Sequence, residues 1–166
     1  MVLNVDIHGK REYAETDKEV SELIAEAVEN LSFEQVDSPW VDPGEDAWFM
    51  WAERRLKGRE RPDNHLRVAV NSSTGYGALL WFFNAERAER ANDSVSDRIW
   101  VSNNPTPPNF DPRVVSDPGY PLFHDPISTI PVSEVRRALQ EFCDTKTGDR
   151  PTCVEWTQAE MNGTRL

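Results

Sequence analysis

The chain has 166 residues, of which 38% are hydrophobic, and it contains six tryptophans and two cysteines. This length and apolar content predict one folded domain over residues 1–166 and exclude a disordered chain. Two cysteines cannot form a disulfide framework, and the sequence shows neither a signal-peptide pattern nor an apolar run of about 18 residues. We therefore expect a cytoplasmic protein that does not bind membranes.

The net charge of −11 is concentrated near the N-terminus. Residues 12–50 contain twelve acidic residues and one basic residue, so this quarter of the chain carries the whole excess. Such a field repels nucleic acid and accelerates association with a cationic partner. The alternative is a solvated face that only keeps the protein soluble. Residues 53–61 are basic, and they could pair with the acidic quarter.

The N-terminal third predicts a strand, a helix and a loop. Residues 2–7 alternate as a strand, and residues 8–15 are typical of a turn with loose flanks. Residues 16–31 predict a helix, because Thr16 and Glu19 form a capping box and an apolar stripe follows. Residues 32–46 are polar, and their two prolines and one glycine indicate a loop. Within that loop Trp40 either packs on the core, the commoner fate, or points outward.

The remaining segments complete a sheet and a second helix. Apolar or alternating runs predict strands at 47–53, 65–70, 78–83, 99–102 and 152–156, with a further edge strand at 113–116. Residues 84–98 are polar and could contain a short turn, and residues 103–131 contain many prolines and cannot form a regular helix. Residues 131–145 predict a helix that begins with proline.

This order of elements predicts an α+β fold with two layers. The expected architecture is an antiparallel sheet of about five to six strands, with two helices and a long proline-rich loop. In the last strand, Val154 and Trp156 are expected to be buried under the second helix. Cys153 and Glu155 would then take the opposite face.

Catalytic and metal-binding signatures are weak. Asp117, His124 and Asp125 lie close together in the proline-rich loop, where His124 and Asp125 could act as a general base. The alternative is an ordinary turn composition. Cys143 lies at a helix C-terminus, where the helix dipole disfavours a reactive thiolate. No metal or cofactor motif is present, so we expect no metal, no cofactor and no catalytic residues.

The C-terminal third resembles a known family. The segment from Asp117 to Trp156 contains "HDPISTIPVSEVRRALQEF" followed by "TGDRPTCVEW". This run resembles bacterial immunity protein family 1. It consists of an Asp-Pro loop, a helix that begins with proline, a Gly-x-Arg-Pro turn and a closing strand. The strand pair that ends in "YGALLWFF" also fits the middle of that family, and the similarity extends over residues 45–160, strongest from 117 to 156. These residues form the fold and are not a catalytic signature.

The resemblance implies a non-enzymatic antidote that binds a cognate toxin, often a nucleic-acid deaminase. Contact residues are not implied by it, so we infer them from charge. Toxins that bind nucleic acid have basic clefts, which an acidic surface can block. The residues expected to bind the partner are Glu34, Asp37, Trp40, Asp42, Glu45 and Asp46, with Trp40 as an aromatic anchor.

Two other functions remain open, as does the oligomeric state. The first is a small α+β enzyme that uses His124 and Asp125, or Glu155, in a pocket under the proline-rich loop. The second is an acidic interaction protein with another cationic partner. The sequence is compatible with a monomer or a weak homodimer.

Overall fold

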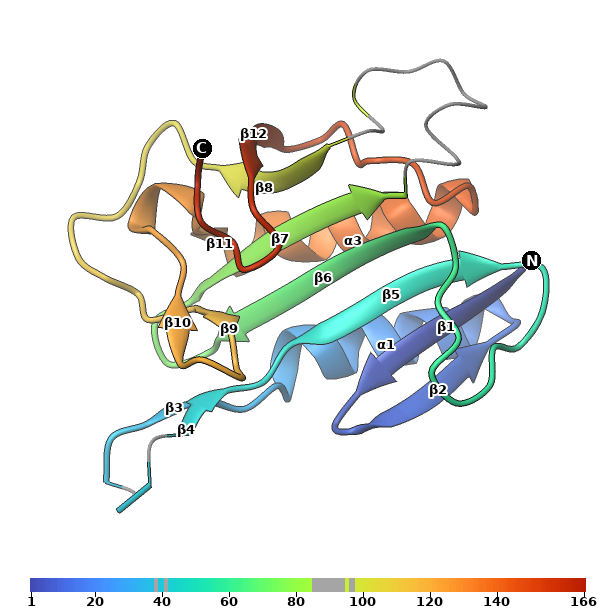
Figure 1. Cartoon of the computed structure of the whole chain (residues 1–166), viewed down its shortest axis with the longest axis horizontal. Coiled ribbons are helices and arrows are strands. Elements are labelled where there is room, and N and C mark those ends of the chain that lie inside the picture. The colour runs from blue at the N-terminus through green and yellow to red at the C-terminus, as the bar shows by residue number, and fades with distance from the viewer. Residues whose placement is uncertain (38, 41, 85–94, 96–97) are drawn as a thin grey trace.

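A computed structural model describes residues 1–37, 39–40, 42–84, 95 and 98–166. In these residues one large antiparallel sheet carries both α-helices on the same face (Figure 1). The expected two-layer α+β class is confirmed. Most of the expected turn at 84–98 lies outside the described residues.

The main sheet has eight strands within the described ranges, more than the five to six expected. Its order is β12-β8-β7-β6-β5-β1-β2, and the short β11 also pairs with β7. The strands are β1 (Val2–Ile7), β2 (Lys10–Ala14), β5 (Ala47–Ala52), β6 (Asn64–Asn71), β7 (Tyr76–Phe83), β8 (Ile99–Asn103), β11 (Ile130–Pro131) and β12 (Glu155–Ala159). The expected meander of three consecutive strands is β5-β6-β7.

Strand β2 was expected to be part of a loosely flanked turn, and that expectation is wrong. His8 and Gly9 both have positive φ, 53° and 74°, so they form a tight two-residue connection between β1 and β2. Strand β2 lies at the sheet edge and is mostly exposed or half-buried. An edge strand needs no regular apolar alternation, which is why its charged sequence did not indicate a strand.

Both expected helices are present. Helix α1 (Asp17–Glu29) begins with the expected capping box, in which Thr16 and Glu19 each accept the other's backbone N–H. Helix α3 (Val132–Thr145) follows Pro131, which occupies its N-cap position. No helix within the described residues is long and apolar enough to span the hydrocarbon core of a membrane.

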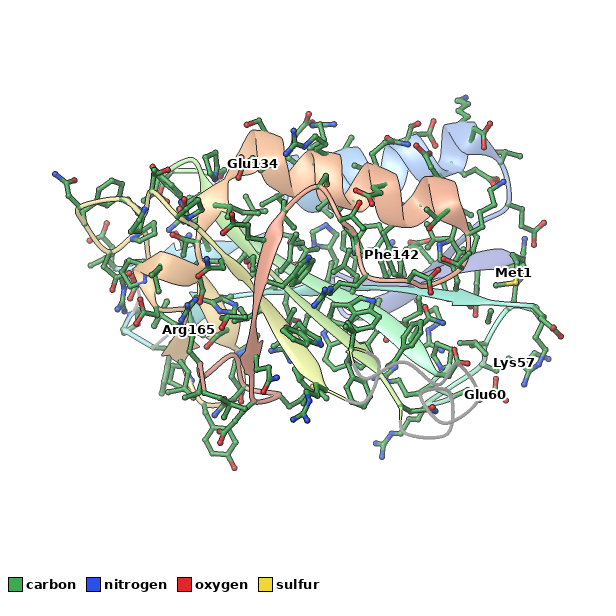
Figure 2. The ribbon with its side chains drawn as sticks, turned by 90° about the horizontal axis from the view of Figure 1, so that it is seen from above. Met1, Lys57, Glu60, Glu134, Phe142 and Arg165 are labelled. Atoms are coloured by element: carbon green, nitrogen blue, oxygen red, sulfur yellow. The ribbon has the colours of Figure 1, made fainter. Side chains whose placement is uncertain are left out.

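The hydrophobic core lies between the helices and the sheet. Figure 2 shows Phe142 beneath α3, directed toward the sheet. Two tryptophans join the layers: the indole N–H of Trp51 donates to the Phe142 carbonyl, and that of Trp81 donates to the Gly148 carbonyl, both at 3.0 Å. Their rings add apolar area, and their polar atoms are satisfied.

The expected loop at 32–46 contains a small hairpin made of β3 (Phe33–Gln35) and β4 (Asp42–Gly44). We call β3, β4 and the described residues between them the arm. In Figure 1 the arm extends beyond the sheet, at the end of the molecule opposite the N-terminus. Gly44 has a φ of +105°, and a Cβ atom there would lie 2.7 Å from the Ser32 carbonyl oxygen. A glycine is therefore required at the base of the arm.

A second hairpin lies at the same end of the molecule (Figure 1). It consists of β9 (Val115–Asp117) and β10 (Leu122–Phe123), and β9 overlaps the edge strand expected at 113–116. This strand pairs with β10 and not with the main sheet. A 3₁₀ turn at Pro126–Ser128 leads from the hairpin to β11.

The last strand begins later than expected. Residues 152–154 are not part of β12, because the Glu141 carboxylate accepts the backbone N–H groups of Thr152 and Cys153 and holds this segment against α3. Trp156 packs against the core as expected, and Val154 does so from outside the strand. Cys153 also packs there, so its expected position on the opposite face is wrong.

Candidate functional site

The arm presents apolar side chains to solvent. Trp40 is 80% exposed and Val36 is 86% exposed, so the common burial of tryptophan does not apply here. Exposed large apolar side chains of this kind mark interaction surfaces when they cluster. Val36 is not among the expected contact residues, although it is as exposed as Trp40.

Two of the expected acidic residues accompany Trp40 on the arm. Asp37 and Asp42 are both exposed. Asp42 also accepts the backbone N–H of Gly44 at 3.1 Å, a local hydrogen bond within β4. An aromatic side chain with carboxylates beside it suits a partner that offers an apolar pocket with a cationic rim.

Two further acidic residues support the base of the arm. Glu34 forms a bidentate ion pair with Arg113, with oxygen–nitrogen distances of 2.6 and 2.9 Å. The Arg113 guanidinium lowers the pKa of Glu34. Glu45 accepts a hydrogen bond from the Ser32 hydroxyl at 2.7 Å. Its Oε1 atom lies 2.5 Å from the Nδ1 atom of His8. These carboxylates hold the arm in position.

Asp46 is directed into the protein. Its side chain is 18% exposed and lies 3.5 Å from the guanidinium of Arg67, itself 8% exposed. Burial raises the pKa of Asp46 and lowers that of Arg67, and the attraction between the two charges opposes both shifts. The six expected contact residues therefore divide into an exposed group, Asp37, Trp40 and Asp42, and a supporting group, Glu34, Glu45 and Asp46.

Elsewhere, the basic segment at 53–61 is partly neutralised within the molecule. Arg55 pairs with Glu15 at 2.9 Å, as the sequence suggested. Arg61 pairs with Asp6 at 2.8 Å, and Arg54 pairs with Glu60 at 2.9 Å. The acidic residues of the arm are not among the partners in these pairs.

The histidine–aspartate alternative is not supported by the geometry. His124 is 5% exposed, and its Nδ1 atom has no hydrogen-bond partner. Burial lowers the pKa of His124 to about 3. The Asp125 carboxylate accepts the Ile127 backbone N–H and caps the 3₁₀ turn. His124 is thus a neutral, buried residue that substrate cannot reach. Asp125 stabilises the start of the 3₁₀ turn.

The buried histidines predict a loss of stability in mild acid. His65, at 6% exposure, has its pKa lowered to about 4 by burial, and His124 has a pKa of about 3. In the unfolded chain both regain a pKa near 6.5, so that state binds more protons below pH 6.5. Their contribution to stability is complete above pH 6.5 and declines toward pH 4. We expect urea unfolding to give a free energy about 2 kcal/mol lower at pH 5.5 than at pH 6.5.

The control for this prediction is the double variant His65→Gln/His124→Gln. Between pH 6.5 and 5.5 its free energy of unfolding should change much less than that of the wild type, whatever its absolute stability. The carboxylates with lowered pKa values titrate below this window. A double variant with the wild-type slope would contradict the assignment.

The thiols and the last-strand acid also lack the properties of catalytic groups. Burial raises the pKa of Cys143 to about 12 and contributes most to raising that of Cys153 to about 11, so both are thiols at neutral pH. Glu155 is exposed at the start of β12 and accepts a hydrogen bond from Asn103 at 3.2 Å. Among the described residues, no three histidine, cysteine, aspartate or glutamate side chains form a group that could hold a metal ion.

Comparison with known proteins matches the chain to a family. The model of the family described as immunity protein Imm1 matches residues 8–158. No curated protein and no solved structure matches the chain. The matched range includes both helices, the arm and the β9–β10 hairpin.

Proposed function

The chain belongs to the immunity protein Imm1 family, and from this we propose that it neutralises its toxin by inserting the arm into a basic cleft. The family supports a role in toxin immunity. The observation that carries the proposed mechanism is the 80% exposure of Trp40 on a projecting hairpin beside the exposed Asp37 and Asp42. An aromatic anchor supplies binding energy, and the carboxylates match the cationic rim of the cleft.

The toxin that fits this surface best is one that acts on nucleic acid, and we propose a nucleic-acid deaminase. Such an enzyme must bind phosphates, so the entrance to its active site is basic. A base removed from its stack is held there by stacking and hydrogen bonds. Trp40 with Asp37 and Asp42 resembles this substrate chemically, since it offers one aromatic ring beside negative charges.

The concentration of negative charge assists the encounter. Residues 12–50 carry a net charge of −11, and the arm lies within this range. Long-range attraction raises the association rate of oppositely charged proteins by about 10- to 1,000-fold at low salt. Rapid capture suits an antidote, because free toxin acts at once. The chain itself then needs no catalytic residue.

Co-expression with the toxin domain encoded by the adjacent gene tests this function. We expect the chain to restore growth, to co-purify with the toxin at equal stoichiometry and to abolish deamination of a single-stranded oligonucleotide. Association should slow about tenfold or more between 20 mM and 300 mM salt. A folded chain that neither restores growth nor binds the toxin would overturn the proposal. If the chain restores growth while the toxin shows no deaminase activity, only the proposed toxin chemistry is wrong.

A further inference from the structure

Most of the exposed large apolar side chains lie on the arm, on the β9–β10 hairpin or on two neighbouring segments. Eight such residues are exposed within the described part of the chain. Met1 and Leu166 are terminal. Of the other six, two lie on the arm, two lie on the β9–β10 hairpin, one lies in the loop before β9, and one lies in the turn after β12. These six, which we call the apolar end face, are Val36, Trp40, Phe110, Tyr120, Leu122 and Met161.

The segments of the apolar end face are held together by a buried arginine. The Arg67 guanidinium donates to the carbonyl oxygens of Ser116, in β9, and Met161, at 2.9 and 2.7 Å. It also pairs with Asp46, two residues beyond β4. One side chain of strand β6 thus connects the hairpin, the C-terminal turn and the base of the arm.

A second contact joins the arm directly to the segment that leads into β9. Arg113 binds Glu34 of β3 through two hydrogen bonds, and its guanidinium lies 3.6 Å from the centre of the Phe123 ring in β10. The Asn71 side chain donates to the carbonyl oxygens of Pro112 and Arg113, both at 3.1 Å. The two hairpins are therefore fixed relative to each other before any partner binds, which lowers the entropic cost of binding.

The charges around the apolar end face indicate the kind of partner. Residues 105–125 contain three acids and one arginine, and that arginine is already paired with Glu34 and Asp111. Asp117 lies in β9, and the exposed Glu160 precedes Met161. Carboxylates around apolar side chains favour a partner with apolar pockets and a cationic rim. A second copy of this chain would bring like charges together, and nucleic acid would be repelled.

We propose that the β9–β10 hairpin is the second half of the toxin-binding surface. Tyr120 and Leu122 contact the toxin at the same time as Trp40 of the arm. This inference rests on the proposed function and extends it, since neither the charge pattern nor the family resemblance pointed to these residues. The arm enters the cleft, and the hairpin binds an apolar patch on the toxin beside it.

Binding of purified wild-type and variant chains to the toxin domain tests the inference. The variants are Tyr120→Ser, which changes a side chain 77% exposed in a turn, and Tyr120→Ser/Leu122→Ser. We expect the double variant to bind about 10- to 30-fold more weakly, chiefly through faster dissociation, and the single variant to account for part of that loss. Melting temperatures should change little for Tyr120→Ser, because little buried area is removed.

The matched control is Lys18→Ser/Glu22→Ser on α1, where the side chains are 86% and 64% exposed. It should bind as the wild type does. If both hairpin variants bind the toxin with wild-type affinity, the inference is overturned and the proposed function stays intact. The same conclusion follows if the control variant loses as much affinity as the hairpin variants. Absence of binding by the wild-type chain would overturn both. A wild-type dimer that the hairpin variants convert to a monomer would assign this face to a second copy and overturn the inference.

Discussion

Replacement of Trp40 with alanine is expected to weaken toxin binding by about 30- to 1,000-fold. Central aromatic anchors contribute about 2–4 kcal/mol to protein–protein interfaces. Trp40 is the largest exposed side chain on the arm, and no other aromatic residue lies between β3 and β4. The measurement is the dissociation constant of the purified complex, together with the amount of chain needed to restore growth in co-expression.

The binding kinetics of this variant should distinguish the contribution of the Trp40 side chain from that of the acidic residues. Trp40→Ala should dissociate faster, with an association rate close to that of the wild type. Asp37→Asn/Asp42→Asn should instead associate more slowly at low salt and show a weaker dependence on salt. The two variants therefore control each other. Because Trp40 is 80% exposed, its replacement should leave the urea midpoint unchanged. A Trp40→Ala chain that binds with wild-type affinity would remove the arm from the interface.

The sequence indicated the elements that rely on local rules. Helix α1 could be predicted because Thr16 and Glu19 satisfy the first N–H groups of the helix and an apolar stripe follows them. The central strands could be predicted because they are buried beneath the helices. Buried strands need long apolar runs such as that of β7. The arm could not, since its strands have three residues each and depend on a close approach of Gly44 to Ser32.

The site was harder to predict than the fold for a similar reason. The pattern of acids around Trp40 is visible in the sequence, but the direction of each carboxylate depends on distant partners. Asp46 is directed inward because Arg67 lies on the neighbouring strand, and Glu34 is held by Arg113, 79 positions away in the sequence. Tyr120 and Leu122 gave no signal, because an apolar residue in a proline-rich loop is as compatible with burial as with exposure.

Arg67 is the residue whose replacement should damage the scaffold of the binding surface most. We expect Arg67→Met to lower the free energy of unfolding by about 3–5 kcal/mol, the usual effect of removing one partner of a buried ion pair. The Asp46 carboxylate would lose its counterion, and the Ser116 and Met161 carbonyl oxygens would lose their donor. Urea unfolding measures this loss, and hydrogen exchange should show that protection falls in the β9–β10 hairpin.

Two further variants test this explanation. Asp46→Asn keeps a polar group beside Arg67, so it should lower the free energy of unfolding by less, about 1–2 kcal/mol. Arg67→Met/Asp46→Leu removes both buried charges, so it should be more stable than Arg67→Met alone. In an Arg67→Met chain that remains folded, the hairpin loses the hydrogen bond from Arg67 to Ser116 but keeps those from Asn71 to the segment before β9. The hairpin is then held less firmly, so toxin should dissociate faster although no contacting side chain has changed. Wild-type stability and hairpin protection in Arg67→Met would show that the two hairpins are held in place by other contacts.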